Sequence, residues 1–347
     1  DEWKWNKHQT ISIKLFEKFV QLIRFISMDV SIIIVNYNTK DLTINCLRSI
    51  FRHTSGISYE VIVVDNSSID GSQKSIKKLF PQVILIENKE NMGFGKANNL
   101  AAKRANGKYL FFLNSDTILL NNAIYMLFNF NEKKSTELKI GVSGGILLDN
   151  NKRMTLSFGP FPTMIGTLKS LVLVFFKPRL NKMTFKEVKF FKANNFMEVD
   201  YITGADMFIN RSLFIESGGF DPIFFMYFEE TDLQFRLKKL GYNNYLIFGP
   251  QIIHIGDGSS NKIKANNLKR IYMVKSTFHY FRKHSNRLSF FLFKTLYFIL
   301  RIPTILYLSY TIEEKKNYLK SIINSWLNHM AASWNIFLVI YWLTDIY

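Results

Sequence analysis

The sequence predicts an α/β fold in which helices cover both faces of a wound sheet, followed by a helical, basic and apolar C-terminal region. Two observations carry this prediction. Four short apolar runs rich in isoleucine and valine recur between residues 30 and 113, and each run ends in a cluster of polar side chains. Apolar runs without alternation are typical of strands that helices cover on both faces. With 347 residues, 48% of them hydrophobic, the chain is long enough for one large core or two modest ones.

The four predicted strands come first along the chain. They are Val30–Val35, Glu60–Val64, Val83–Ile86 and Tyr109–Leu113. A helix is expected over Leu42–Phe51, with Cys46 as an ordinary core residue. A single cysteine excludes a disulfide framework and a multi-cysteine zinc site, which fits a reducing cytosol.

Polar side chains gather where these strands end. The clusters are Asn36, Tyr37 and Asn38; Asp65, Asn66, Ser67 and Ser68; Asn91, Gly93, Phe94 and Gly95; and Asn114, Ser115 and Asp116. Because the carboxyl ends of parallel strands meet at one edge of a sheet, where ligands bind, we expect the four clusters to form one site.

Asp65 has two interpretations. Its carboxylate can accept a hydrogen bond from the N3–H group of a pyrimidine while the following serines and asparagines hold a ribose. Alternatively, these residues cap the next helix, and capping is favoured when the segment is taken alone.

The third cluster suits a phosphate. Gly93 and Gly95 let backbone N–H groups approach an anion at the start of a helix. The flanking asparagines Asn91, Asn98 and Asn99 are poor helix formers, which favours a role toward a ligand.

Asp116 stands at the end of a buried strand, where an unpaired carboxylate is costly. It is expected either to hold a divalent cation beside a diphosphate or to cap the following turn. His254 follows another apolar run and precedes a Gly- and Ser-rich loop. Most single histidines are structural, but a neutral imidazole is a good ligand for Mn²⁺ if this loop lies at the same crevice.

An acidic cluster follows the aromatic run Phe224–Phe228 at the start of a predicted helix. Its members are Glu229, Glu230 and Asp232. Such a cluster can simply respond to the helix dipole. Alternatively, partial burial beside the aromatic run raises a carboxyl pKa toward the range of a general base. Arg236, one turn later, is expected to pair with Asp232 and leave another carboxylate free.

Together these motifs resemble a family 2 glycosyltransferase of the GT-A fold, in the rhamnosyltransferase-like branch of bacterial surface-polysaccharide synthesis. The resemblance runs from about Val30 to about Ser260. It implies a mixed sheet, a UDP- or dTDP-sugar donor whose base and ribose lie at IVNYN and Asp65, and a donor-sugar and phosphate contact along the stretch from Asn91 to Asn98. Asn114-Ser115-Asp116 stands where the family carries Asp-x-Asp, with Asn114 in place of the first carboxylate.

The resemblance continues into the second half of the domain. The loop containing Thr203, Gly204, Ala205 and Asp206 is similar to the family's acceptor-side loop, and Arg236 is assigned to the same side. Glu230 stands where the family carries its catalytic aspartate, with Glu229 as a second candidate. The implied mechanism is a single displacement with inversion. Glu230 is the general base, and Asp116 and His254 hold Mg²⁺ or Mn²⁺.

The expected domains are an amphipathic N-terminal helix over residues 1–27, a GT-A domain over 28–260 and a helical region over 261–347. The GT-A domain divides into a nucleotide-sugar-binding half, 28–140, and an acceptor-side half, 141–260. The net charge of +18 favours polyanionic partners. In the C-terminal region basic residues alternate with apolar ones, which suits helices lying on an anionic membrane surface. The alternative for this region is a helical bundle or a homo-oligomer interface.

Localisation follows from the N-terminus and from the acceptor. The N-terminal segment lacks an unbroken apolar stretch and a cleavage site, so we expect a cytoplasmic protein, peripheral on the inner face of the plasma membrane. The acceptor is expected to be a glycan on a polyprenyl diphosphate. Two other readings stay open: a catalytically silent GT-A-like scaffold and a nucleic-acid-binding protein. The second has the charge but no compact motif, so no nucleic acid is expected.

Overall fold

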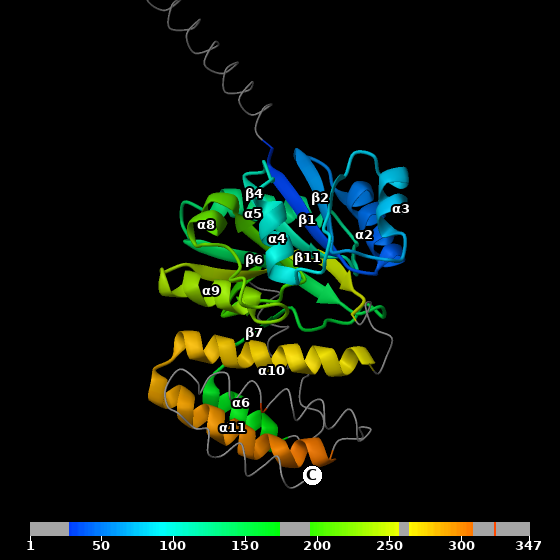
Figure 1. The fold of residues 1–347 in the computed structure, drawn as a ribbon. Helices are drawn as coiled ribbons and strands as arrows, with labels where there is room; N and C mark the ends of the chain where they lie inside the picture. The colour runs from blue at the N-terminus through cyan, green and yellow to red at the C-terminus, as the bar shows by residue number, and fades with distance from the viewer. Residues whose placement is uncertain (1–27, 174–194, 257–263, 308–322, 324–347) are drawn as a thin grey trace, which may run out of the picture. The chain divides into compact units, whose positions relative to one another are not determined.

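The computed structural model describes residues 28–173, 195–256, 264–307 and 323 (Figure 1). The chain divides into two compact units. The sheet unit comprises the described parts of residues 1–160, 186–222 and 230–259, and the helical unit those of 161–185, 223–229 and 260–347. The helix predicted over residues 1–27 and the last apolar stretch, Ser333–Tyr347, lie outside the described residues.

The described residues of the sheet unit form a nine-stranded mixed sheet. Its main path, in spatial order, is β3 (Ile84–Glu87), β2 (Tyr59–Asp65), β1 (Val30–Asn36), β4 (Tyr109–Asn114), β10 (Asp206–Asn210), β6 (Ile140–Leu148), β11 (Asn243–His254) and β5 (Thr117–Leu119), and β8 (Phe196–Val199) pairs with β11 off this path. The four predicted strands are confirmed, and β1 through β4 pair in parallel.

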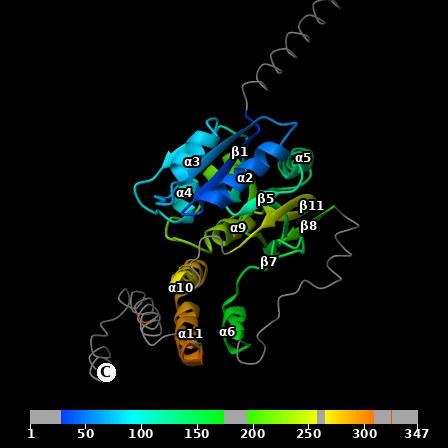
Figure 2. The same ribbon diagram turned by 90° about the vertical axis from the view of Figure 1, so that its right-hand side faces the viewer.

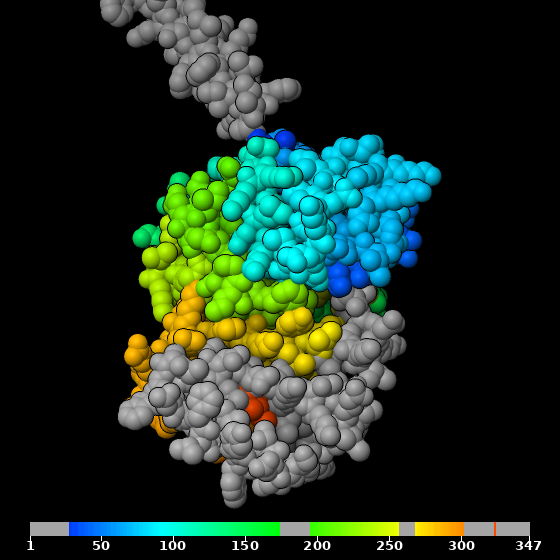
Figure 3. Space-filling model, in the orientation of Figure 1, coloured from blue at the N-terminus to red at the C-terminus, as the bar shows by residue number. Residues whose placement is uncertain are grey.

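Helices cover both faces of this sheet because neighbouring residues of each strand point to opposite sides. Phe111 of β4 belongs to the core packed under α2 (Lys40–His53), α3 (Ser72–Leu79) and α5 (Ala123–Lys134). Phe112, the next residue, instead contacts Phe214 of α8 (Arg211–Glu216) with ring centroids 4.9 Å apart. Cys46 is buried in α2, as predicted. Another helix, α4 (Phe94–Ala102), packs on β1 and lies on the surface shown in Figure 3.

Antiparallel strands complete the sheet and position the site. β10 runs antiparallel between β4 and β6, and its first residue, Asp206, lies opposite Leu113. β5 is three residues long and runs antiparallel to β11, with Thr117 opposite His254. The rest of this unit includes α9 (Glu229–Lys239) and a small sheet of β7 (Phe158–Gly159) and β9 (Tyr201–Ile202).

The helical unit contains α6 (Met164–Leu173), α10 (Lys264–His284) and α11 (Arg287–Tyr307), and α6 lies beside α11 in both ribbon views (Figures 1 and 2). Aromatic rings join α10 to α11, with Phe281 and Phe293 at a centroid distance of 4.7 Å. The domain division therefore differs from the one expected at residue 260, since α6 and residues 223–229 group with the C-terminal helices. Among the described helices, none combines the length and the apolar character needed to cross a bilayer.

Candidate functional site

Asp116 and His254 meet at one edge of the sheet. The hydroxyl of Thr117 donates to the carbonyl of Asn114 at 2.7 Å and closes a tight turn after β4. The short β5 then runs back beside β11 and places His254 opposite Thr117. As a result, Oδ1 of Asp116 lies 3.3 Å from Nε2 of His254, and the amide nitrogen of Asn114 lies 3.3 Å from the same Nε2.

This pair fits a divalent cation. Two ligands that each lie about 2.2 Å from a metal at right angles are about 3.1 Å apart, close to the observed separation. The side chains of Asp116 and His254 are 15% and 27% exposed, so a ligand can reach them. In the described parts of the chain no group of three or more His, Cys, Asp and Glu side chains could hold a metal. The predicted pair would therefore supply only part of a coordination shell.

Asp65 organises its own loop. Its Oδ1 accepts from the backbone N–H of Ser68 at 2.9 Å and from Nε2 of Gln73 at 2.7 Å, while Oδ2 accepts from Nδ2 of Asn36 at 2.5 Å. The carboxylate is fully buried. These bonds close the loop after β2 and do not form the cap that was the alternative for this segment, because Asp65 accepts from no backbone N–H of α3. The role of Gln73 was not foreseen.

A buried hydroxyl network joins the first and fourth clusters. Oδ1 of Asn36 accepts from the hydroxyls of Thr39 and Thr43 at 2.7 and 2.8 Å, and the Thr39 hydroxyl lies 3.0 Å from that of Ser115. The strand ends of β1 and β4 thus share one polar edge, as expected from the parallel pairing. Tyr37, at the same edge, keeps 43% of its surface exposed.

Asn38 shapes the turn that follows. It adopts a left-handed backbone, φ 54°, which asparagine tolerates better than most residues. Its Oδ1 accepts from the backbone N–H of Ile69 at 2.9 Å, and its own N–H donates to the Ser68 hydroxyl at 2.9 Å. Ser67 is also left-handed, at φ 66°. The loops after β1 and β2 are therefore folded against each other.

The glycine loop before α4 is held from both sides. Oδ1 of Asn91 accepts from the N–H of Gly93 at 2.9 Å, and the amide of Asn66 donates to the Gly93 carbonyl at 3.1 Å. Gly93 has φ 83°, a conformation that favours glycine. The second and third clusters therefore also meet, with Gly95 buried in the first turn of α4.

The asparagines of α4 have structural partners. The amide of Asn98 donates to the carbonyl of Phe94 at 3.1 Å within the helix. Asn99 pairs with the backbone of Phe220, donating to its carbonyl at 2.7 Å and accepting from its N–H at 3.0 Å. The sequence analysis interpreted these asparagines as ligand-binding because asparagine is a poor helix former. Their hydrogen bonds within the protein are sufficient to explain why they occur in α4.

Glu230 is the accessible carboxylate of the acidic cluster. It is partly buried, whereas Glu229 is only 4% exposed. Burial raises the pKa of Glu230, and hydrogen bonds to its carboxylate from Thr231 and its own backbone offset this only in part. A Cβ atom added at Gly204 would lie 3.6 Å from Cγ of Glu230, so the loop passes directly beneath this side chain.

Gln234 fixes that loop to α9 and was missed by the sequence analysis. Its Oε1 accepts from the N–H of Ile202 at 2.7 Å and its Nε2 donates to the Ile202 carbonyl at 2.8 Å. Three residues on, the carbonyl of Ala205 accepts from the N–H of Asn114 at 3.0 Å. The segment from Ile202 to Ala205 therefore connects Glu230 with the strand that leads to Asp116.

Asp232 and Arg236 form a structural pair. Asp232 is fully buried, and its Oδ2 accepts from Nε of Arg236 at 2.9 Å, as predicted. The same guanidinium donates to the carbonyls of Ser217 and Gly219. Both side chains thereby hold the turn after α8, and the assignment of Asp232 to the catalytic cluster and of Arg236 to the acceptor side stays a prediction.

Asp206 is inside the sheet rather than at an acceptor surface. It is fully buried, and its Oδ2 accepts from the N–H of Gly145 at 2.6 Å. Burial raises its pKa well above the usual range. Oδ1 of Asp206 and the hydroxyl of Thr203 are buried without a hydrogen-bond partner among the described residues. The assignment of Asp206 to the acceptor side stays a prediction, and its buried carboxyl is not exposed to a ligand in this structure.

Comparisons with known proteins identify the family. The family model described as Glycosyl transferase family 2 matches residues 31–214, more than half of the chain. A poly(ribitol-phosphate) beta-glucosyltransferase of Bacillus spizizenii is 35% identical over 124 residues, which are 34% of this chain and 20% of that protein. An N-acetylglucosaminyl-diphospho-decaprenol L-rhamnosyltransferase of Mycobacterium tuberculosis is 25% identical over 219 residues, 60% of this chain and 70% of that one.

The fold has a solved counterpart. A crystal structure of GalNAc-T7 with UDP, GalNAc and Mn²⁺ aligns with a TM-score of 0.52 at 15% identity, over 76% of this chain and 53% of that one. This likeness confirms the GT-A fold. The chain thus spans about half of that structure and a fifth of the Bacillus relative. The matches to rhamnosyltransferases, with that of Escherichia coli, WbbL, at 25% identity over 54% of this chain and 69% of that one, agree with the motifs. The chain belongs to glycosyl transferase family 2.

Proposed function

We propose that this chain transfers a sugar from a UDP- or dTDP-sugar to a hydroxyl of a lipid-linked glycan during the synthesis of a surface polysaccharide. The observation that carries the proposal is the junction at Ala205. One short loop joins the Asp116–His254 pair, through Asn114, to the partly buried carboxylate of Glu230. A donor-binding edge and a candidate base are thereby held by the same backbone.

The donor would lie along the edge formed by the four loops. Tyr37 offers an exposed ring to a base, and the glycine turn at Gly93 precedes the N-terminus of α4, which favours a phosphate. Asp116 and His254 would hold Mg²⁺ or Mn²⁺. When bound, the cation supplies positive charge toward the leaving diphosphate. Asp65 contributes indirectly, because its carboxylate holds the loop after β2 against Asn36.

Glu230 is the residue for proton transfer. Its raised pKa moves it toward the working pH, where a carboxylate accepts a proton most effectively. In a single displacement the acceptor oxygen attacks the anomeric carbon as Glu230 takes its proton. The bond from that carbon to the diphosphate oxygen breaks, the nucleoside diphosphate leaves, and the configuration inverts. Burial, and then the nearby carboxylate of Glu230, raise the pKa of Tyr201.

Similarity to rhamnosyltransferases supports rhamnose as the candidate sugar and a polyprenyl diphosphate as the carrier. The direct test is a transfer assay with a panel of UDP- and dTDP-sugars and a short-chain lipid diphosphate that carries N-acetylglucosamine. Release of nucleoside diphosphate with one donor, and a product of inverted anomeric configuration by NMR, is the expected result. Transfer with retention would contradict the assigned role of Glu230.

A catalytically silent scaffold is the second candidate. Asn114 replaces a carboxylate beside His254, and the Asp65 carboxylate is already occupied by three protein donors. A chain that binds a nucleotide but transfers no sugar from any donor in the panel would favour this alternative.

A further inference from the structure

Helix α11 is apolar on two faces. One face is buried within the helical unit and includes Phe293, 2% exposed, and Tyr297, 5% exposed. The opposite stripe is exposed over three helical turns, with Leu288, Leu292, Leu296 and Ile299 each between 47% and 70% exposed. Residues at these spacings lie on one side of a helix. Packing within the helical unit therefore accounts for one apolar face of α11 and leaves the other exposed.

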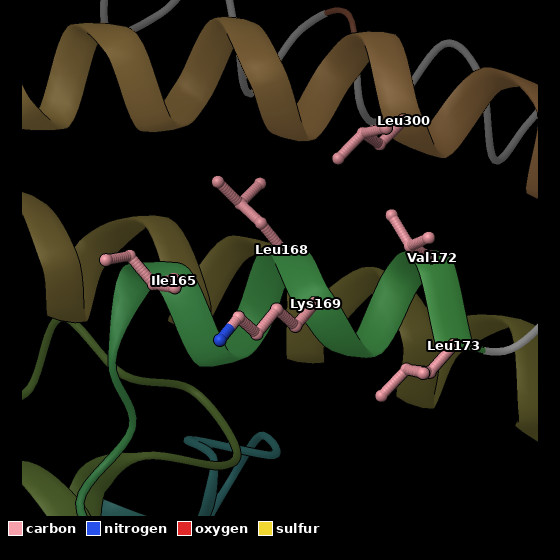
Figure 4. Close-up of a pocket in the computed structure, with 6 residues that line it drawn as sticks. All are labelled: Ile165, Leu168, Lys169, Val172, Leu173 and Leu300. Atoms are coloured by element: carbon pink, nitrogen blue, oxygen red, sulfur yellow. The ribbon is translucent and has the colours of Figure 1, made fainter.

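Helix α6 extends this exposed surface. An open cavity of about 370 Å³ lies along α6 and is bounded by Leu300 of α11. Leu168, Val172 and Leu300 point into it, while Lys169 lies along α6 beside them (Figure 4). Ile165 and Leu173 of α6 are 67% and 51% exposed. Exposed apolar side chains therefore lie on both helices, and large exposed apolar areas often mark binding surfaces.

All charged side chains of α6, α10 and α11 are basic. α10 carries six lysines and arginines, α11 three and α6 one, and none of the three helices contains an aspartate or glutamate. Arg282, Lys283 and Arg287 are exposed where α10 gives way to α11, directly before the apolar stripe begins at Leu288. Apolar side chains bordered by cations match an anionic bilayer surface.

We propose that the exposed faces of α6 and α11 form one lipid-binding surface that lies in the plane of an anionic membrane. The apolar stripe enters the acyl layer, the cavity along α6 receives a hydrocarbon chain, and the basic residues at the turn contact lipid phosphates. A second copy of the chain is the less suitable occupant, because pairing two such faces would bring like charges together. A segment from the middle of the chain, α6, thereby acts together with the C-terminal helices.

A single introduced cysteine can report on this surface in the full chain. The sole native cysteine, Cys46, is fully buried, and burial raises the pKa of its thiol to about 12, so it reacts poorly with a thiol label. Leu292→Cys on α11 and Leu173→Cys on α6 place an environment-sensitive fluorophore on the proposed surface. Ile215→Cys on α8, 51% exposed in the sheet unit, is the matched control.

Each labelled protein is titrated with vesicles of phosphatidylcholine and with vesicles that also contain phosphatidylglycerol. The expected result is a blue shift of the labels at 292 and 173 with the anionic vesicles and no shift at 215. A shift at 292 without one at 173 would overturn the two-helix surface. An equal shift with the neutral vesicles would overturn the role of charge. A shift that appears without vesicles when the protein concentration is raised would identify a dimer interface instead.

Substitution provides the second measurement. Leu292→Glu together with Leu296→Glu puts two charges on exposed positions, so circular dichroism should remain unchanged while vesicle sedimentation falls at least about tenfold. Undiminished sedimentation would refute the surface. Vesicle binding needs neither donor nor metal, so its failure and a failure of the proposed sugar transfer are separate results.

Discussion

At the residue scale, the chemistry depends on the carboxylate at position 230, which is one methylene longer than the aspartate of the motif it resembles. The structure gives this side chain partial exposure and a raised pKa, whereas Glu229 is buried and Asp232 is paired. Sequence alone predicted the pairing of Asp232 with Arg236 from their spacing. It did not reveal which of the two glutamates is accessible, because that depends on how the loop at Gly204 passes α9.

Glu230→Gln is expected to lower sugar transfer at least about a hundredfold, because the amide cannot accept the proton. Donor binding should stay unchanged, since the substitution keeps the size of the side chain. Initial rates and calorimetric donor affinities measure the two effects. Glu230→Asp, which restores the residue of the motif, is the matched control and should retain more activity than the glutamine variant. Wild-type turnover by Glu230→Gln would remove this residue from the mechanism.

Asp206 makes a prediction about stability. Its pKa is raised in the folded protein, so folding favours the protonated form. Its contribution to stability is complete below the unfolded pKa of about 4 and is lost as the pH rises toward the folded pKa. Asp206→Asn, which cannot ionise, should therefore gain stability relative to the wild type as the pH increases. Urea unfolding of both proteins at several pH values tests this, and a difference that does not change with pH would show that burial does not control this carboxyl.

At the scale of elements, the strands were predictable where both faces are buried. β1, β2 and β4 are mainly apolar and do not alternate with polar residues, and each ends in the polar cluster that the parallel register aligns. β5 was not predicted, because three residues leave no periodic signal, and yet its return beside β11 is what brings Asp116 to His254. The grouping of α6 with α11 could not be predicted from the sequence either, because it depends on contacts between segments that are distant along the chain.

Two helices share one cap. The residues before α2 and α3, Thr39 and Gly71, provide no capping side chain. Asp70 serves both helices instead, accepting from the N–H of Lys40 at 2.8 Å and of Ser72 at 3.0 Å. Burial opposes the charge of Asp70, but hydrogen bonds from Ser72 and Lys40 outweigh it and hold the pKa below the usual value.

Asp70→Ala is expected to cost about 1 to 2 kcal/mol of unfolding free energy at neutral pH, as for other lost caps. Because the folded pKa is lowered, this stabilisation is present above the unfolded pKa and is lost as the pH falls through the folded value. The gap between wild type and variant should thus narrow in acid. Asp70→Asn, which keeps one acceptor but no charge at the helix N-termini, should fall between them. Equal unfolding free energies for all three proteins would exclude the shared cap.

At the scale of the whole molecule, the two units divide the proposed work. The sheet unit carries the donor edge and the candidate base, and the helical unit carries the basic, apolar surface. The net charge of +18 is informative only after this division, because the lysines and arginines of α6, α10 and α11 have no acidic residues beside them in those helices. Composition alone could not separate a membrane partner from nucleic acid, whereas the exposed stripe on α11 favours lipid.

The central claim is that Asp116 and His254 bind a nucleoside diphosphate through a divalent cation. The measurement that tests it most directly is a calorimetric titration of UDP and of dTDP into the full chain, with Mn²⁺ and then with a chelator. We expect one nucleotide to bind only with the metal, and both Asp116→Asn and His254→Ala to weaken that binding at least about tenfold. Binding that is equally tight in the chelator and in both variants would contradict the account.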